Sequence, residues 1–384
     1  MPHKSKMEKK IDDYLDGNVA AKKNNKKKVW IKGEYKELDV YRFPIHLLTF
    51  NLDNTRFEVQ KLKDEKENGP IDATTPEGKE RIIKLLIYDR GKMDKDAKKL
   101  ITSLKKNKQL EPGIMTPDGA IIDGNRRLAC LIYLDRNTSG NQFAYFDACR
   151  LPPGSEELDY FTVEADNQWA KDLKKEYDPL NKYMMLRRAL RVFELSPKAI
   201  GHLRRVSTKE IEKEIAELEV MEEFLRTTEE PEDFTQIDGQ TENFTEIAKQ
   251  LTKYKKASAK ATEIKKYKKL AFSLIKVNQE TPKTTTYRDF RKMNRAFSSG
   301  TKRLISAYSK AQGVKDPEEV KEVMSKGAEK TQMQKIKKKP DNLAADLYET
   351  AKKLREERRE QTFSQNCKNL LERSEAIINK ILEK

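Results

Sequence analysis

The sequence contains few of the residues that build metal modules, disulfide frameworks or membrane spans. It has three cysteines, at positions 130, 149 and 367, and three histidines in 384 residues. Their wide separation excludes a Cys/His zinc module and a disulfide framework, and we expect a reduced compartment. No run of about 18 apolar residues is present, so we expect no transmembrane helix. Residues 1–17 lack the apolar core of a secretory signal, and we expect a cytoplasmic protein, nucleoid-associated if its source is prokaryotic.

Positive charge is what the sequence has in excess. It contains 79 Lys and Arg against 63 Asp and Glu, a net charge of +16, and 37% of its residues are charged. A field of this sign favours a polyanionic partner, and we expect DNA rather than a membrane surface. The length predicts two or three domains, since a domain commonly spans about 100–200 residues.

Composition and apolar spacing divide the chain into four segments. Residues 1–28 are polar and lysine-rich and predict a flexible basic arm. Residues 29–165 contain short apolar runs typical of an α/β domain, with an inserted loop at 58–80 where Gly, Pro and Thr are frequent. Residues 166–235 predict helices, and residues 236–384 predict a basic helical region. The expected fold class is therefore α+β, with an α/β N-terminal domain followed by a mostly α-helical region.

The most informative stretch is a predicted junction between a strand and a helix. GIMT and AIID read as strands around a Pro-Asp-Gly turn, and a helix follows from Asn125. Gly124 permits a tight turn, and the first helical N–H groups point beyond the strand end. Two arginines in the first helical turn, Arg126 and Arg127, oppose the helix dipole unless they hold an anion. The alternative is that one of them pairs with Asp123 or Asp118 as structural support.

The segment from Val40 to about Ala189 resembles the ParB/sulfiredoxin domain. The matching residues are Phe43–Leu48, then Asn51, Asn54 and Arg56, then Ser103–Pro112, and finally Ile121–Ala129 with its Asp-Gly-Asn-Arg-Arg box. The resemblance implies a nucleotide-binding α/β domain. In that family, partition proteins use CTP as a switch for sliding along DNA, other members are small-molecule kinases or nucleases, and sulfiredoxin repairs an over-oxidised cysteine with ATP.

The resemblance also implies roles for individual residues. The nucleotide site that it implies consists of Gly124, Asn125, Arg126, Arg127 and Arg56. Asp166 and Asn167 match an acidic-Asn pair, and they are expected to hold Mg²⁺ because hard oxygen ligands suit that ion. The expected cofactor is therefore a nucleoside triphosphate, CTP or ATP, with Mg²⁺.

The sequence departs from the family in two places that bear on chemistry. Sulfiredoxin requires a cysteine directly after the glycine, where this chain has Asn125, so we do not expect that reductase activity. The family's arginine after Gln168 is missing, and extra residues follow before Asp178, which argues against regulated CTP hydrolysis but not against nucleotide binding. The candidate catalytic residues are Asp123, Glu164 and Gln168, for an NTPase or a nuclease, and whether the protein is an enzyme stays open.

A helix-turn-helix is the next element that the resemblance implies. Ser196 can cap a first helix, Gly201 is its small residue, and Ser207 precedes a second helix. That second helix carries five glutamates between 210 and 219, which would be repelled by DNA phosphates. A base-reading motif and an ordinary helical hairpin therefore both stay open.

The region after residue 250 holds the strongest cationic clusters. Between 253 and 269 eight lysines accompany one acidic residue, Glu263, and are interleaved with Tyr254 and Tyr267. Further on, arginines and a lysine from 288 to 295 follow helical spacing on one stripe. Such stripes suit phosphate contacts, although a solvated face over a core of Phe290 and Met293 is the alternative. The residues expected to contact DNA are Lys255, Lys256, Lys265, Lys266, Arg288, Arg291 and Arg295.

Leucines and isoleucines between 343 and 381 follow helical spacing and predict either a homodimer seam or packing within the chain. The leading hypothesis is a ParB-like, nucleotide- and DNA-binding protein, an NTP-dependent switch. One alternative is a metal-dependent nuclease or a small-molecule kinase on the same domain. The other is a non-catalytic helical scaffold in a mobile-element or defence system.

Overall fold

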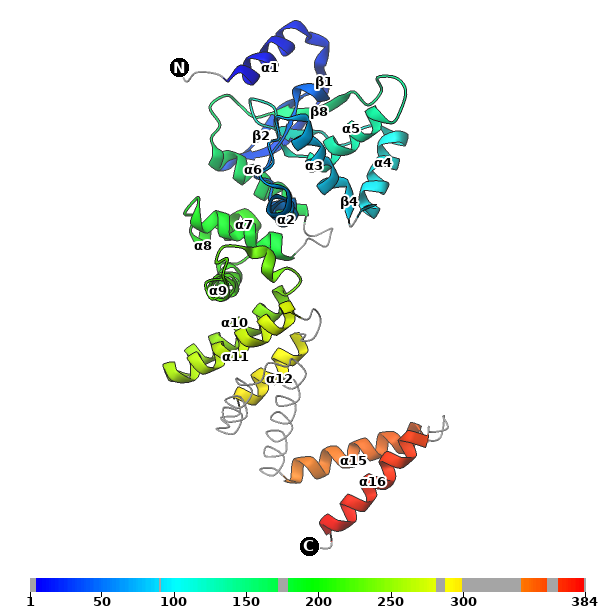
Figure 1. Cartoon of the computed structure of the whole chain (residues 1–384), viewed down its shortest axis with the longest axis vertical. Helices are drawn as coiled ribbons and strands as arrows, with labels where there is room; N and C mark the ends of the chain where they lie inside the picture. The colour runs from blue at the N-terminus through cyan, green and yellow to red at the C-terminus, as the bar shows by residue number, and fades with distance from the viewer. Residues whose placement is uncertain are drawn as a thin grey trace. The chain divides into compact units, whose positions relative to one another are not determined.

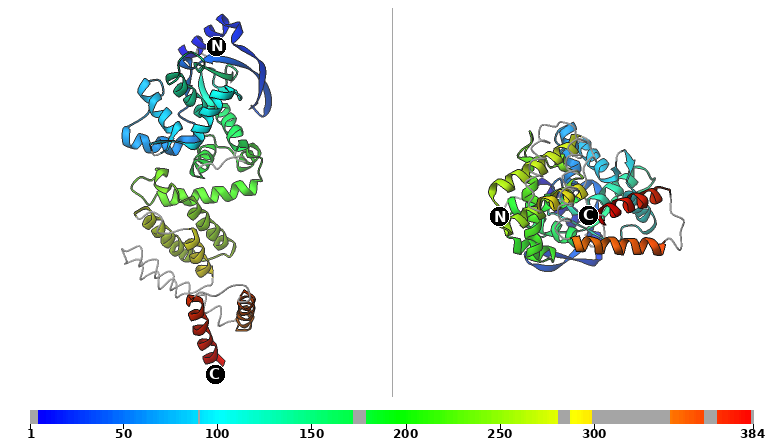
Figure 2. Two further views of the ribbon diagram at one scale, coloured as in Figure 1. Left: turned by 90° about the vertical axis from the view of Figure 1, so that its right-hand side faces the viewer. Right: turned by 90° about the horizontal axis from the view of Figure 1, so that it is seen from below.

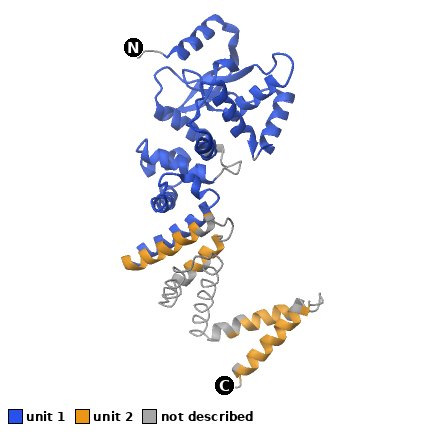
Figure 3. Ribbon diagram, viewed as in Figure 1, with its two compact units in different colours: residues 1–258 blue, residues 259–384 orange. Residues whose placement is uncertain are grey.

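The structure is a computed structural model that describes residues 5–89, 91–171, 179–280, 287–298, 340–357 and 365–382. It divides into two compact units, residues 1–258 and 259–384 (Figure 3). The helix expected at the start of the C-terminal region, α10 (Thr241–Lys256), belongs to the first unit. The predicted boundary at 235/236 therefore lies inside that unit.

A six-stranded mixed sheet organises the first unit, in the order β1-β2-β8-β6-β7-β3. Its strands are β1 (Lys22–Ile31), β2 (Glu34–Pro44), β3 (Thr49–Phe50), β6 (Gly113–Met115), β7 (Ala120–Asp123) and β8 (Tyr145–Arg150). The pairs β1/β2, β2/β8 and β6/β7 are antiparallel, while β6/β8 and β3/β7 are parallel. A separate small hairpin joins β4 (Tyr88–Asp89) to β5 (Lys92–Met93). Figure 2 shows the long β1–β2 ribbon, in dark blue, curving along one side of this unit.

Helices cover both faces of the sheet. They are α1 (Lys6–Gly17), α2 (Glu58–Asn68), α3 (Pro76–Ile87), α4 (Lys95–Asn107), α5 (Asn125–Arg136) and α6 (Glu157–Lys171), with short 3-10 turns η1 (Val19–Ala21), η2 (Ile45–Leu47) and η3 (Thr55–Phe57). Helices α3, α4 and α5 lie on one side, with α6 on the other (Figure 1). Because side chains alternate along a strand, Ile121 of β7 enters the core under α5 and Ile122 enters the core under α6.

The α+β fold class and the local elements around the junction are confirmed. Helix α4 buries Ala97, Ile101 and Leu104 along one face, and Leu100 is partly buried. Strands β6 and β7 flank the predicted turn, and α5 begins at Asn125 as expected.

The flexible arm predicted at residues 1–28 is wrong, because residues 6–28 contain α1, η1 and most of β1. Ser5 caps α1 by accepting a hydrogen bond from the Glu8 N–H, and Ile11 is completely buried. The Asp12 carboxylate pairs with Arg150 at 2.6 Å. Lysines of β1 form ion pairs with acidic residues elsewhere in the fold. A polar, lysine-rich composition, although typical of a solvated arm, is therefore compatible with a β-strand.

The predicted loop at 58–80 is also wrong, because it contains α2 and the start of α3. Thr75 caps α3 by accepting from the Gly78 N–H, and Pro76 occupies the first helical turn. Helix α3 then buries Ile82 and Leu86. The Gly and Pro that suggest a loop in fact mark the end of one helix and the start of the next.

Helices complete the first unit. They are α7 (Pro179–Arg191), α8 (Pro197–Arg204), α9 (Thr208–Leu225) and α10, with the 3-10 turn η4 (Phe234–Ile237). Asp178, the residue before α7, lies outside the described residues. Two of the five α9 glutamates are buried: Glu214 pairs with Arg204 and Lys182, and Glu217 accepts from the Tyr183 hydroxyl. Part of the acidity of α9 is therefore internal.

The second unit contains α11 (Ala261–Glu280), α12 (Tyr287–Ser298), α15 (Pro340–Glu357) and α16 (Gln365–Leu382). Tyr267 and Phe290 are fully buried, and the Tyr267 hydroxyl donates to Asn294 at 2.7 Å. Apolar side chains of α15 and α16, such as Leu347 and Ile377, are exposed, and the homodimer seam stays a prediction. No helix in the described ranges is both long and apolar enough to cross a membrane.

Gly113→Ala should destabilise the sheet beside the junction. An added Cβ would lie 2.4 Å from Cε1 of Phe146 and 2.9 Å from the Asp123 carbonyl oxygen, and the Phe146 ring is completely buried. Overpacking of this kind costs about 1–3 kcal/mol. Chemical denaturation measures the effect, with Gly17→Ala as the control because nothing lies within 4 Å of its added Cβ. Equal stability of the two variants would contradict the packing described here.

Candidate functional site

The junction between β7 and α5 is a tight turn that requires glycine. Gly124 adopts a left-handed conformation, with φ +112° and ψ 14°, directly before the first residue of α5. Its carbonyl oxygen accepts the first helical hydrogen bond, from the Leu128 N–H at 2.8 Å. A Cβ at this position would lie 3.0 Å from Cζ of Phe146. The predicted role of Gly124 in the backbone turn is thus confirmed, whereas its contact with a nucleotide stays a prediction.

Two buried asparagines brace this turn against neighbouring loops. The Asn125 amide group donates to the Ile121 carbonyl at 2.7 Å, and its oxygen accepts from the Asn51 N–H at 3.3 Å. The Asn54 amide donates to the Ile122 carbonyl and accepts from the Arg56 N–H, each at 3.1 Å. Asn125 therefore has a bracing role beyond the one the resemblance implies. Asn54 fixes η3, and with it Arg56, beside the end of β7.

Arg126 carries a buried donor atom that has no hydrogen-bond partner in the described part of the protein. Its Nη1 lies 3.2 Å from the carboxylate of Asp94, but its buried Nε has no hydrogen-bond partner among the described residues. Burial lowers the pKa of Arg126, and the nearby charge of Arg56 lowers this pKa further. Arg56 and Arg126, which are distant in sequence, are therefore close enough in the fold to repel one another.

Arg127, the next residue of α5, also has a buried donor atom without a hydrogen-bond partner among the described residues. Its side chain is 14% exposed, Nη2 lies 3.6 Å from the exposed Glu111 carboxylate, and the buried Nη1 lacks a hydrogen-bond partner in the described part of the chain. Arg126 thus pairs with Asp94, and Arg127 with Glu111. Asp94 could have been found as the N-cap of α4, but its pairing with Arg126 depends on the tertiary fold.

The three candidate catalytic residues are bound within the protein. Asp123 pairs with Lys27 of β1 at 3.2 Å. Glu164 is 2% exposed and accepts from the Thr55 N–H at 2.8 Å, the Thr55 hydroxyl at 2.9 Å and the Gln168 amide at 2.7 Å. Burial raises the pKa of Glu164 to about 7. Glu164 and Gln168 thus attach α6 to η3, and a catalytic role for any of the three stays a prediction.

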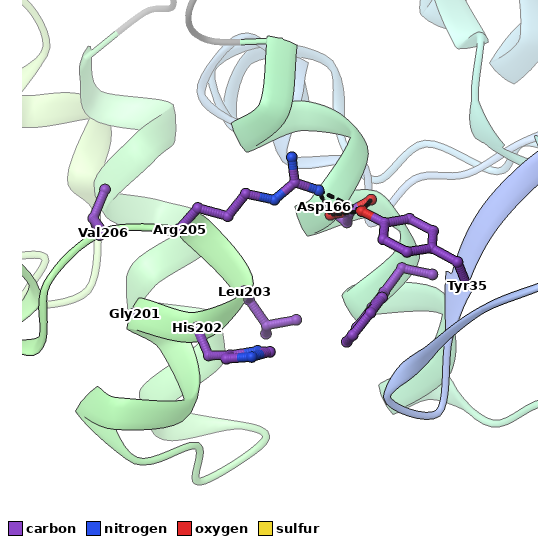
Figure 4. Close-up of a pocket in the computed structure, with 8 residues that line it drawn as sticks. Tyr35, Asp166, Gly201, His202, Leu203, Arg205 and Val206 are labelled. Carbon is purple, nitrogen blue, oxygen red and sulfur yellow. Dashed lines mark hydrogen bonds and ion pairs between the residues drawn. The ribbon is translucent and has the colours of Figure 1, made fainter.

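The predicted magnesium ligands on α6 have other partners. The Asp166 carboxylate lies 3.1 Å from Arg205 and accepts from the Tyr35 hydroxyl at 3.3 Å, as Figure 4 shows. The Asn167 amide donates to the Val163 carbonyl at 2.8 Å. Within the described ranges, no group of three or more His, Cys, Asp or Glu side chains is arranged to hold a metal ion. Asp166 is neutralised by Arg205 here, and its binding of Mg²⁺ stays a prediction.

Asp166 also lines a pocket of about 610 Å³ next to the turn between α8 and α9. Its other lining residues are Trp30, Tyr35, Gly201, His202, Leu203, Arg205 and Val206 (Figure 4). The interactions described above for Arg126 and Arg127 involve none of these residues. The pocket and the β7–α5 junction are therefore separate candidate sites of the first unit, and sequence analysis did not find the pocket.

The two helices expected after Ser196 and Ser207 are confirmed as α8 and α9, while base reading by them stays a prediction. Ser196 and Ser207 cap α8 and α9 by accepting from backbone N–H groups. Arg205, where such turns often use glycine, has a left-handed backbone with φ +57°. A Cβ on Gly201 would lie 3.0 Å from the Val206 carbonyl oxygen, so the turn packs closely on α8.

The residues expected to contact DNA are exposed where their side chains are described. Lys255 and Lys256 end α10, Lys265 and Lys266 lie in the first two turns of α11, and Arg288 and Arg291 lie on α12 near the ring of Tyr287. Arg295 belongs to α12, but its side chain lies outside the described residues. Tyr267 is buried and bonded to Asn294, so it does not belong to an exposed aromatic surface.

Comparisons with known proteins give only distant likenesses. No protein-family model matches the chain, and no curated protein matches it. One similar solved structure is C-terminally truncated chromosome-partitioning protein ParB from Caulobacter crescentus, complexed to the centromeric parS site. It has 13% identity and a TM-score of 0.32, over 66% of this chain and 98% of that one. The same protein with CTP-gamma-S has 14% identity and a TM-score of 0.21, over 55% and 92%. The fold class itself follows from the sheet and helices described above.

Glu164→Gln should change the pH dependence of stability. Because burial raises the pKa of Glu164 from 4.5 to about 7, the folded protein retains a proton that the unfolded chain releases. The contribution of this group is full at low pH and declines as pH rises from about 4.5 to 7. Glutamine keeps an acceptor oxygen without the charge. The free energy of unfolding of the variant should therefore increase relative to that of the wild type across this pH window, by roughly 3 kcal/mol at most.

Thermal unfolding of both proteins from pH 5 to pH 8 measures this gain. Glu157→Gln is the matched control, since Glu157 is an exposed carboxylate on the same helix. A stability difference between Glu164→Gln and wild type that stays constant with pH would show that Glu164 is not a buried acid of raised pKa.

Proposed function

We propose that the β7–α5 junction binds the phosphate groups of a nucleoside triphosphate, and that the protein is a nucleotide-binding, DNA-associated protein. The observation that carries this proposal is the pair of buried guanidinium nitrogens, Nε of Arg126 and Nη1 of Arg127, which lack hydrogen-bond partners among the described residues. A buried donor left unpaired costs about 1–3 kcal/mol. Phosphate oxygens, with several lone pairs each, would satisfy both donors.

The local charge supports an anion at this site. Arg126 and Arg127 lie in the first turn of a 12-residue helix, where the dipole is positive, and Arg56 adds a third cation nearby. The compensating carboxylates are partly exposed, with Asp94 at 31% and Glu111 at 71%. Ion pairs that solvent screens in this way contribute little to stability. A multivalent anion would bridge the three arginines and accept from the free N–H groups of the helix.

The type of ligand follows from the resemblance to the ParB/sulfiredoxin domain. The Asp-Gly-Asn-Arg-Arg box implies a triphosphate, CTP or ATP, and Asn125 argues against sulfiredoxin chemistry. Asp123, the first suspect for a nuclease, is paired with Lys27. Binding, rather than catalysis, is therefore the function that we assign to this junction.

The DNA-associated part of the proposal rests on the cationic helices. Lys265 and Lys266 of α11 and Arg288 and Arg291 of α12 are exposed, while apolar residues of the same helices, such as Phe290, are buried. One side of each helix thus packs and the other presents positive charge to solvent. Neutralising phosphates with such charges releases counterions and gives salt-dependent affinity.

Arg127→Ala should weaken nucleotide binding. The loss of a charged hydrogen-bond donor corresponds to about 10- to 150-fold in affinity. Isothermal titration calorimetry with CTP, ATP, GTP and ADP in the presence of Mg²⁺ measures it. Arg136→Ala, at the other end of α5 and paired with the exposed Glu80, is the matched control. Absence of binding by the wild type, or equal loss in both variants, would remove the proposed site.

Reversing two charges on α11 should weaken DNA binding and flatten its salt dependence. For Lys265→Glu with Lys266→Glu, we expect the slope of log affinity against log salt to decrease by about 2, because two phosphate contacts are lost. Fluorescence anisotropy with a labelled duplex at several salt concentrations measures the slope. Lys105→Glu with Lys106→Glu, two exposed lysines of α4, makes the same change of charge elsewhere. An identical slope for both double variants would show that α11 makes no specific contribution.

A further inference from the structure

We propose that the pocket between the β1–β2 ribbon and α8 binds an unstacked base of single-stranded nucleic acid. Aromatic rings from two distant parts of the chain meet there. The ring centroids of Trp30 and Tyr35 are 4.9 Å apart, and those of Trp30 and His202 are 6.1 Å apart. This site is distinct from the nucleotide site proposed at the β7–α5 junction.

The arrangement of the rings leaves aromatic surface available to a ligand. Trp30 and His202 are inclined at 44°, so they do not stack face to face. Tyr35 is 49% exposed, His202 is exposed, and Trp30 is only partly buried. Aromatic side chains that face a pocket of about 610 Å³ offer the planar apolar surface on which a base can stack.

The Asp166–Arg205 ion pair leaves this pocket without an uncompensated carboxylate for a cationic ligand. The carboxylate of Asp166 is 15% exposed and is already bound by Arg205 and by the Tyr35 hydroxyl. The side chain of Arg205 is 61% exposed. Aromatic rings also attract cationic ligands such as an ammonium or a guanidinium group. Such a ligand would find the Asp166 carboxylate already neutralised by Arg205. A base attached to a phosphate would instead stack on the rings and pair its phosphate with Arg205.

A second exposed cation lies on α8, the helix that contributes Gly201, His202 and Leu203 to the pocket. Helix α8 contains no acidic residue, and its exposed Lys198 lies four residues before His202, on the same face of the helix. Successive cations suit a chain of phosphates better than a mononucleotide. Bases inside a duplex are stacked and paired, so the strand that enters the pocket must be single.

Tryptophan fluorescence gives a direct test of the proposal. The chain has two tryptophans, Trp30 and Trp169, so Trp169→Phe makes Trp30 the only one. Titration of this variant with a 12-nucleotide deoxythymidine strand should quench the Trp30 emission. In fluorescence anisotropy with the same labelled strand, Trp30→Ala should bind about 5- to 150-fold more weakly, while Trp30→Phe, which keeps a ring, should restore most of the affinity.

The controls separate a binding role from a structural one. Tyr88→Ala removes an exposed aromatic side chain elsewhere in the first unit and should leave the affinity unchanged. Lys198→Glu reverses an exposed charge on α8, one helical turn before His202, without removing a ring, and should weaken binding even if Trp30→Ala fails to fold. Arg127→Ala should not change the titration, which keeps this test independent of the nucleotide site. The proposal is overturned by unquenched Trp30 emission at saturation, by equal affinity of Lys198→Glu and wild type, or by equal quenching with a duplex.

Discussion

The contact of the Phe146 ring with two glycines fixes the centre of the first unit. Gly113 begins β6 and Gly124 precedes α5, and an added Cβ on either residue would meet this completely buried ring. The absence of both side chains lets β6, β7 and β8 come together while the chain turns from β7 directly into α5. The position of the first turn of α5, and therefore of Arg126 and Arg127, depends on this packing.

Buried polar side chains then connect this centre to segments that are remote in sequence. Asn125 joins α5 to the residue after β3, Asn54 joins η3 to β7, and Glu164 joins α6 to η3. Each of these groups is almost completely buried and would destabilise the fold if it lacked partners. Their combined effect is to hold Arg56 of η3 near Arg126 in the first turn of α5. Structural bracing and the proposed anion site thus share the same small set of elements.

Local sequence signals made the β7–α5 junction predictable. Features that depend on pairing between distant segments were difficult to predict from the sequence. The turn at Gly124, the caps Ser196 and Ser207, and the apolar face of α4 are each encoded within a few residues. By contrast, the lysines of β1 find partners such as Asp123 only after the sheet forms. The burial of Tyr267 likewise depends on Asn294, 27 residues later. Charge composition alone cannot distinguish such residues from a solvated arm or an exposed aromatic surface.

The position of β1 gives its lysines a further consequence. It is an edge strand, and the other edge of the sheet is β3, which is only two residues long. Exposed edges invite pairing with strands of other molecules, and closely spaced charges or a very short strand discourage it. Lys22, Lys26 and Lys28 would bring like charges together if two β1 edges approached each other. The basic N-terminal segment therefore protects this protein against edge-to-edge aggregation, independently of any polyanion that it binds.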